Sequence, residues 1–200
     1  MSDATLDGDK TSSTIDVSLY PDATSSSGTS FAGTAANETF LGTQGADGAI
    51  NGAGGNDVLA GNAGADTING GDGNDKIIGG SGNDILSGGA NSDIFVFETL
   101  VDGKDSISDF SILAPAAGGD VLDVSQVLNH SGNTWADGSG VAAAITGEYL
   151  TFTNVGGFVQ VNVDIDGKAG SNYAPTPIAI LTTVAFVDPA TDLADNIKVD

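Results

Sequence analysis

The sequence predicts an all-β fold, a parallel β-roll (a β-solenoid) followed by a β-rich C-terminal cap. The first observation is a nine-residue unit that recurs between Gly33 and Val96, because fixed-period repeats of this length indicate solenoids. The second is composition: 30 of the 200 residues are Gly, about twice the usual share. The third is an excess of Asp over Glu among the 27 acidic residues, which favours turns and oxygen-ligand sites over solvated helices.

Residues 1–32 are rich in Ser, Thr and Asp, and we expect a linker or a frayed N-terminal segment there. The roll is expected over residues 33–98 and the cap over residues 99–200. Five copies follow one another without a break from Gly52: GAGGNDVLA, GNAGADTIN, GGDGNDKII, GGSGNDILS and GGANSDIFV. Two weaker copies begin at Gly33 and Gly42, and we interpret Asn51 as a one-residue insertion before the strong copies.

Each copy combines a six-residue turn of Gly, Asn and Asp with a three-residue strand. Glycine permits the positive φ angles that such turns need, and the middle residue of a short strand points to one face. Two copies complete one coil, and stacked coils bury the middle residues as a ladder. The predicted ladder, at repeat position eight, is Phe40, Ala49, Leu59, Ile68, Ile77, Leu86 and Phe95. A flexible Gly-rich linker, the alternative interpretation, needs no apolar residue at a fixed phase.

Repeat position six carries an acidic residue in all seven copies. Turns on one edge of the roll are two copies apart, so Asp57, Asp75 and Asp93 are expected on one edge. The residues Asp47, Asp66 and Asp84 are expected on the other. Stacked carboxylates repel one another, and Ca²⁺ accepts irregular sets of six or more carboxylate and carbonyl oxygens. We therefore predict about four or five bound calcium ions, held between neighbouring turns.

The predicted ligands of the strong copies are the position-six carboxylates together with turn residues at positions one, three and five. They are Gly52, Gly54, Asn56 and Asp57; Gly61, Ala63, Ala65 and Asp66; Gly70, Asp72, Asn74 and Asp75; Gly79, Ser81, Asn83 and Asp84; and Gly88, Ala90, Ser92 and Asp93. Asp47 of the second weak copy joins this set. The first copy carries Glu38 in place of Asp, and the last turn carries Asn91 in place of Gly, so the end sites are the least regular.

The run from Gly52 to Val96 resembles the nonapeptide repeats of RTX (repeats-in-toxin) proteins, which bacteria export by type I secretion. The segments DIFVFE, which begins within the last repeat, DSISDF and DVLDVS resemble the exit from such a roll. The remainder, from Tyr149 to Asp200, resembles the type I secretion target domain of large RTX adhesins. This resemblance implies a secreted or bacterial cell-surface protein with an uncleaved C-terminal signal and a type I exporter as partner. It also implies that Asp109 completes the last calcium site, with Asp84 or Asp93.

In the cap, alternating residues predict strands at Tyr149–Thr153 and Phe158–Asp164, joined by a Gly156–Gly157 hairpin turn. A further strand is expected at Ile178–Val184, and a turn or short helix near Ser125. Several single residues are given ordinary roles. Asp102, Asp120 and Asp123 are expected to be solvated turn acids. Asp164, Asp166 and Gly167 are expected to form a turn rather than an accessory calcium site. His130 is expected to be exposed without a function, and Trp135 to be a core residue of the cap.

Charge and motif content exclude several functions. The net charge is −22, with five Lys and no Arg, so nucleic-acid binding is excluded and an anionic membrane surface would repel the chain. No apolar run is long enough for direct membrane insertion, and residues 1–30 lack a signal-peptide pattern. No HExxH or GxSxG motif occurs, so we expect no enzyme activity within this chain. We also expect the protein to be a monomer.

The sequence leaves three functions open. The first is a calcium-folded C-terminal module of a secreted adhesin. The second is the secretion tail of an RTX protease or lipase whose catalytic domain lies outside this chain. The third is a stand-alone surface or ligand-binding RTX protein; an ice-binding face is disfavoured, because the outward strand positions, from Val58 to Val96, form no ladder of a single residue type.

Overall fold

The structure is a computed structural model that describes residues 24–27, 30–129, 144–165, 174–185 and 193–199. Its strands form two sheets. The seven-stranded sheet runs in the order β1 (Thr24–Ser27), β3 (Glu38–Leu41), β5 (Val58–Ala63), β7 (Lys76–Ser81), β9 (Ile94–Val96), β11 (Val121–Asp123) and β15 (Ile197–Lys198). The eight-stranded sheet runs in the order β12 (Leu150–Val155), β13 (Phe158–Val163), β14 (Thr176–Ala185), β10 (Asp105–Ile107), β8 (Ile85–Ala90), β6 (Thr67–Asp72), β4 (Ala49–Gly54) and β2 (Phe31–Ala32).

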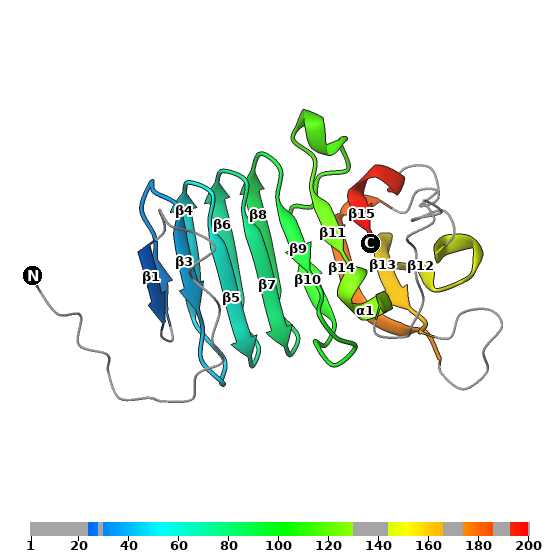
Figure 1. The fold of residues 1–200 in the computed structure, drawn as a ribbon. Coiled ribbons are helices and arrows are strands. Elements are labelled where there is room, and N and C mark those ends of the chain that lie inside the picture. The colour runs from blue at the N-terminus through cyan, green and yellow to red at the C-terminus, as the bar shows by residue number, and fades with distance from the viewer. Residues whose placement is uncertain (1–23, 28–29, 130–143, 166–173, 186–192, 200) are drawn as a thin grey trace, which may run out of the picture.

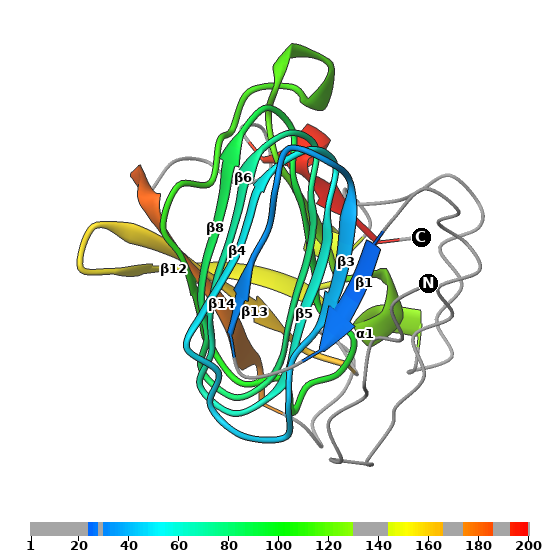
Figure 2. The same cartoon turned by 90° about the vertical axis from the view of Figure 1, so that its left-hand side faces the viewer.

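Successive strands of the repeat region alternate between the two sheets, and each pairs in parallel with the strand one coil away. Figure 1 shows the coils stacked side by side from the N-terminal end to the cap. Figure 2, along the stack, shows that they superimpose as flattened ovals. The sequence prediction of an all-β parallel roll is therefore confirmed, with one strand and one turn for each nine-residue copy.

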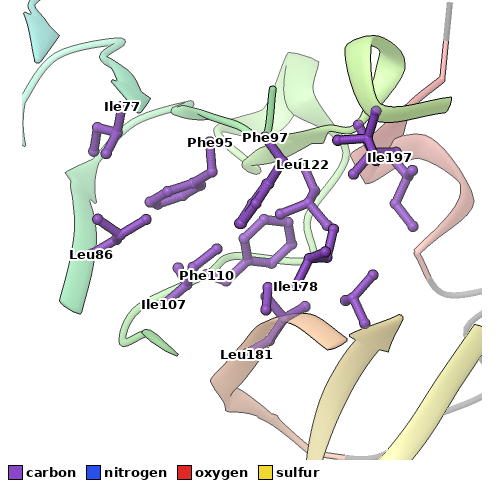
Figure 3. Packing of buried hydrophobic residues seen from close by; sticks show 14 of the residues in the cluster. Ile77, Leu86, Phe95, Phe97, Ile107, Phe110, Leu122, Ile178, Leu181 and Ile197 are labelled. Atoms are coloured by element: carbon purple, nitrogen blue, oxygen red, sulfur yellow. The ribbon is translucent and has the colours of Figure 1, made fainter. Parts of the chain in front are cut away.

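The space between the sheets is filled by two columns of apolar side chains in register. In the seven-stranded sheet, Phe40, Leu59, Ile77 and Phe95 pair one above the other, and Leu122 and Ile197 extend the column through the cap. In the eight-stranded sheet, the corresponding column is Phe31, Ile50, Ile68, Leu86, Ile107 and Leu181. Figure 3 shows Ile77, Leu86 and Phe95 continuing without a break into the cap residues.

One position of the predicted ladder is wrong. Ile50, with 1% of its surface exposed, occupies the core position that the repeat register assigned to Ala49, which is exposed. Ala49 pairs with Thr67. Thr67 directly follows its position-six acid, Asp66, but Gly48 stands between Ala49 and its own position-six acid, Asp47. The extra residue is thus Gly48 rather than Asn51, because this shift buries an isoleucine in place of an alanine and removes more apolar surface from water.

The roll extends beyond the predicted boundaries at both ends. At the N-terminal end, β1 pairs with β3 and β2 with β4, so Thr24–Ser27 and Phe31–Ala32 belong to the first coil. The Phe31 and Phe40 rings stack there, with centroids 4.8 Å apart. At the other end, β10 and β11 add a further coil after residue 98.

The described part of the cap agrees with the sequence prediction. β12 and β13 form an antiparallel hairpin whose turn residues, Gly156 and Gly157, have φ angles of 65° and 97°. β14 covers the predicted strand at Ile178–Val184, and the short helix α1 (Ser125–Asn129) begins at Ser125. Two short 3-10 helices are η2 (Pro115–Ala117) and η3 (Ala194–Asn196). His130, Trp135, Asp166 and Gly167 lie outside the described residues.

Within the described ranges, none of the helices is long and apolar enough to cross a membrane.

Candidate metal centre

The turns between strands bring the main chains of neighbouring coils into close contact. Gly73 and Gly82, at repeat position four, have φ angles of 137° and 147°. A side chain at either position would collide with the carbonyl oxygen of the preceding coil, that of Gly55 or Gly64. Glycine is therefore required twice over at this position, for its backbone conformation and for the space it leaves. These tight turns line both edges of the roll with main-chain oxygens.

The position-six carboxylates form two hydrogen-bonded ladders, one on each edge. In every step, the Oδ1 atom of an Asp accepts a hydrogen bond from the backbone N–H of the equivalent acid one coil earlier, as between Asp75 Oδ1 and Asp57 at 2.8 Å. One ladder comprises Glu38, Asp57, Asp75, Asp93 and Asp120. The other comprises Asp47, Asp66, Asp84 and Asp105. The division of the repeat carboxylates between two edges is as the sequence predicted.

The second carboxylate oxygen of the central residues has no hydrogen-bond partner among the described residues. These buried Oδ2 atoms belong to Asp57, Asp66, Asp75, Asp84 and Asp93. Burying an acceptor without a partner costs about 1–3 kcal/mol, and more when the group is charged. Five such atoms in one array indicate that a ligand outside the polypeptide completes them.

The position-one glycines show where such a ligand fits. A Cβ atom placed on Gly70 would collide with Asp75 Oδ2 and lie 2.5 Å from the carbonyl oxygen of Gly88. At Gly61, the neighbouring oxygens are Asp66 Oδ2 and the Gly79 carbonyl, which lies 2.7 Å from the added atom. The edge thus gathers a carboxylate oxygen and a carbonyl oxygen at the same point in successive turns. Oxygen-only donor sets of mixed type are those that Ca²⁺ accepts.

Among the described residues, no cluster contains three or more Asp, Glu or His side chains that could hold a metal together. At Gly52, Gly61 and Gly70, one carboxylate oxygen lies beside one glycine carbonyl oxygen instead. The oxygen atoms that these residues offer are the kind of donor atom that calcium binds.

Burial and mutual repulsion shift the pKa values of these carboxyl groups upward. Burial raises the pKa of Asp57 and of Asp66 to about 6, with the carboxylates of the neighbouring coils adding to the shift. The pKa of Asp93 is raised to about 7 for the same reasons, and burial raises the pKa values of Asp75 and Asp84 as well. Without a cation, the roll therefore disfavours the ionised form of its own edge residues.

The two N-terminal acids differ from the others because threonines satisfy them. Glu38 accepts hydrogen bonds from the backbone N–H and the hydroxyl of Thr34. Asp47 accepts the same two from Thr43, both at 2.7 Å. A threonine at repeat position two is found only in these two weak copies. Both carboxylate oxygens of Asp47 thus have protein partners, whereas the position-six acids from Asp57 to Asp93 have none for Oδ2 among the described residues.

The remaining predicted ligands lie in or beside the turns. Asn56 and Asn74 use their side-chain Oδ1 atoms to accept the backbone N–H of the next coil, at 2.8 Å and 3.1 Å. The Asn83 side chain accepts the N–H of Lys104 in the same way. The position-three residues are strand residues in register; Ala63 pairs with Ser81, and Asp72 with Gly54 and Ala90. The carbonyl oxygens of Ser81 and Ala90 accept the backbone N–H groups of Gly64 and Gly73, at 2.7 Å and 3.2 Å.

The cap acids are placed differently from the prediction. Asp102, Asp120 and Asp123 are buried, not solvated: Asp102 accepts three hydrogen bonds from Glu98 and Thr99, and Asp123 pairs with Lys198 at 2.8 Å. Asp109 accepts the backbone N–H groups of Gly88 and Gly89, and its charge contributes to the raised pKa of Asp93.

The ladder positions beyond the repeats belong to Asp105 and Asp120, not to Asp109. Burial raises the pKa of Asp105 to about 8 and that of Asp120 to about 6. Sequence reasoning missed both residues because they lie outside the nine-residue spacing. The signal that could have found them is an Asp two residues before a buried Ile or Leu, which repeats the order of positions six and eight.

The fold and its edges define a class: a parallel β-roll with stacked, oxygen-lined turns. Residues 51–86 and 69–97 match the family model described as RTX calcium-binding nonapeptide repeat (4 copies). This part of the chain consists of RTX calcium-binding repeats, as the sequence resemblance implied.

Comparisons of the whole chain add little to this assignment. None of the curated proteins matches the chain. Among solved structures, the chain is similar to a subunit of the mannuronan C5-epimerase from Azotobacter vinelandii, determined in solution, with 26% identity over 83% of this chain and 80% of that chain. The TM-score of 0.32 is too low for this likeness to support a conclusion about fold or activity.

Proposed function

We propose that this chain is a calcium-folded extracellular module that carries its own C-terminal export signal and forms the C-terminal region of a secreted or cell-surface adhesin. The calcium-binding β-roll is the part that the repeats establish. Proteins with RTX repeats are typically secreted, which agrees with the proposed location. The exporter, the adhesin context and the monomeric state belong to the proposal.

The observation that carries the calcium part is the array of five buried Oδ2 atoms without a partner. When bound, calcium supplies the positive charge that balances these carboxylates. The chain contributes the oxygen donors, fixes their spacing through the ladder hydrogen bonds, and excludes water from them by burial. A roll that gains its stabilisation from metal would fold only where calcium is abundant, as it is outside the cell.

We propose no catalytic role within this chain, because its matched repeats are calcium-binding ones and its sequence contains neither an HExxH nor a GxSxG motif. The alternative of a secretion tail on an RTX hydrolase uses the same roll and the same cap. The two alternatives differ only in what lies upstream. The gene context and the intact mass of the natural protein distinguish them.

The first prediction is that folding depends on calcium. Without metal, the edge carboxylates repel one another and the thin apolar ladder does not offset chain entropy. Far-UV circular dichroism should show coil in EGTA at neutral pH and β-structure at about millimolar calcium, the range of extracellular modules. A chain equally structured in both conditions contradicts the proposal.

Two matched variants assign this effect to the ladder. Asp75→Asn removes a charge whose Oδ2 atom has no partner, whereas Glu38→Gln alters a group that Thr34 already satisfies. We expect Asp75→Asn to raise the calcium concentration at the folding midpoint several-fold and Glu38→Gln to leave it nearly unchanged. Equal shifts for both variants would contradict the assignment of the sites.

A further inference from the structure

The two sheets of the roll present outer faces of opposite character. At repeat position nine, side chains point away from the core because they follow the buried position-eight residues. In the eight-stranded sheet, this position carries polar residues in register: Asn51, Asn69 and Ser87. In the seven-stranded sheet, it carries apolar residues in register: Leu41, Ala60 and Ile78. Contiguous apolar side chains on an outer face mark a place where another segment packs.

Part of this apolar outer face is buried although it points away from the core. Thr39 is 2% exposed and Val58 is 8% exposed, and the two residues pair in register at repeat position seven. Further along the same row, Ile94 is 38% exposed. Burial in this row is thus greatest at the N-terminal end of the roll and decreases toward the cap.

The side chain of Thr39 gives a second, independent indication. Its Oγ1 atom is buried and has no hydrogen-bond partner among the described residues. Leaving a buried hydroxyl group without a partner is unfavourable. A segment lying across the outer face would bring backbone N–H and carbonyl groups within reach of this hydroxyl. The outer face at β3 therefore lacks both an apolar and a polar partner.

The chain that precedes Thr24 is placed to provide them. β1 begins at Thr24, at the edge of this sheet, and pairs directly with β3. Residues 1–23 lie outside the described ranges, and their sequence contains one stretch of alternating apolar residues, Ile15, Val17 and Leu19. The five steps from Leu19 to Thr24 can span about 17 Å, whereas two strand spacings, from β1 to β5, amount to about 10 Å. The apolar stretch can therefore reach across β3 and β5.

We propose that residues 15–19 pack across the outer face of β3 and β5, with their apolar side chains against Val58 and Ala60. A second copy of the chain is the less suitable cover, because each copy has a net charge of −22 and the two would repel. The stretch itself contains a single acidic residue, Asp16. This contact goes beyond calcium binding, and it makes the N-terminal segment part of the folded unit rather than a linker.

The test is thiol labelling with a maleimide, because the chain contains no cysteine of its own. Full-length Ala60→Cys in saturating calcium reports on the face proposed to be covered, and Ala49→Cys reports on the exposed outer face of the other sheet. We expect the thiol of Ala60→Cys to react at least about tenfold more slowly, because labelling requires the cover to open.

Two matched pairs of substitutions in the Ala60→Cys chain identify the cover. Ile15→Asp combined with Val17→Asp should remove the protection, because it places charges in the apolar contact. Ser12→Asp combined with Ser13→Asp adds the same charge at polar positions and should leave the protection unchanged. Circular dichroism in millimolar calcium verifies that each chain is folded. If Ala60→Cys does not fold, Thr39→Cys replaces it as the reporter on the same face.

Three results overturn the proposal and leave the calcium-binding roll standing. They are rapid labelling of Ala60→Cys without further substitutions, protection that survives Ile15→Asp with Val17→Asp, and an equal loss of protection in both pairs. Protection that grows with protein concentration assigns the face to a second copy and overturns the proposal as well. A chain that stays unfolded in calcium overturns the proposed function and this contact together.

Discussion

The acids at repeat position six do not all have the same role, although the sequence makes them look equivalent. The carboxylates of Glu38 and Asp47 are completed by Thr34 and Thr43, so the first coil is held by protein hydrogen bonds alone. The following acids keep one oxygen without a protein partner. A threonine at position two thus gives the carboxylate a protein partner where the array begins.

The sequence predicted the acids of the repeats because their spacing is fixed by the coil. It did not predict Asp105 and Asp120, because the segments that carry them have lost the nine-residue spacing and the glycines. Nor could it reveal that Asp109 bonds to Gly88 and Gly89, because Asp105 and Asp109 have the same parity along a strand. Which of two such acids enters a ladder depends on the register between strands, and that is fixed by packing of the whole coil.

The raised pKa values predict an unusual response to pH. The pKa values of Asp57, Asp93 and Asp105 in the folded chain are about 6, 7 and 8, above the ordinary value of about 3.9 expected for the unfolded chain. The calcium-free folded chain therefore binds more protons than the unfolded one across this interval. Its stability should rise as the pH falls from about 8 toward about 4, and should be lost as the pH rises through the folded pKa values.

This pH dependence is measured by far-UV circular dichroism in EGTA between pH 8 and pH 5. We expect the β-signal to grow on acidification, and calcium affinity at the same time to weaken, because protons and calcium compete for the carboxylates. The Asp93→Asn variant, which has no proton to gain at this position, should show a smaller pH response. A β-signal in EGTA that is constant or grows toward pH 8 would contradict the expected proton linkage.

At the scale of elements, each strand from β2 to β9 contributes one side chain to an inner column, and the columns hold the coils together. The alternation of one apolar residue with polar turns was enough to predict strands, sheet type and burial for the strong copies. It failed at Ala49, where the nine-residue spacing is interrupted. Burying Ile50 there removes more apolar surface from water than burying Ala49 would. It also gave no indication that Ile107, Leu122 and Ile197 continue the columns, because the cap strands have no common period.

Two isoleucines in successive repeat copies test this division between core and surface. Ile77 is fully buried in its column, whereas Ile85 is 55% exposed on the outer face of β8. Ile77→Ala should lower the free energy of unfolding by about 2–5 kcal/mol, because it leaves a cavity that the stacked coils cannot close. Ile85→Ala should change it by no more than about 0.5 kcal/mol. Urea unfolding in saturating calcium measures both values, and similar losses for the two variants would contradict the assigned inward face.

At the scale of the whole molecule, the C-terminal segment is part of the folded cap. β15 pairs with β11, and the side chain of Asn196 donates hydrogen bonds to the carbonyls of Leu113 and Asp120, each at 2.7 Å. Ile197 is 6% exposed and Val199 is 1% exposed. A partner that recognises this segment by its side chains would therefore meet them before the cap folds, and the calcium dependence of the roll delays folding in a calcium-poor cytosol.

The export role proposed for the tail leads to the last prediction. Deleting residues 149–200 removes the segment that resembles a type I secretion target domain, and we expect this chain to stay in the cell pellet of a host with a cognate exporter. Deleting residues 1–23, which precede the first strand of the roll, should leave export intact. The full-length Asp75→Asn variant controls for loss of folding, because it weakens the roll but keeps the tail; it should appear in the medium. If the tail-deleted chain reached the medium without cell lysis, or if Asp75→Asn were retained to the same extent, the tail would not be the export signal.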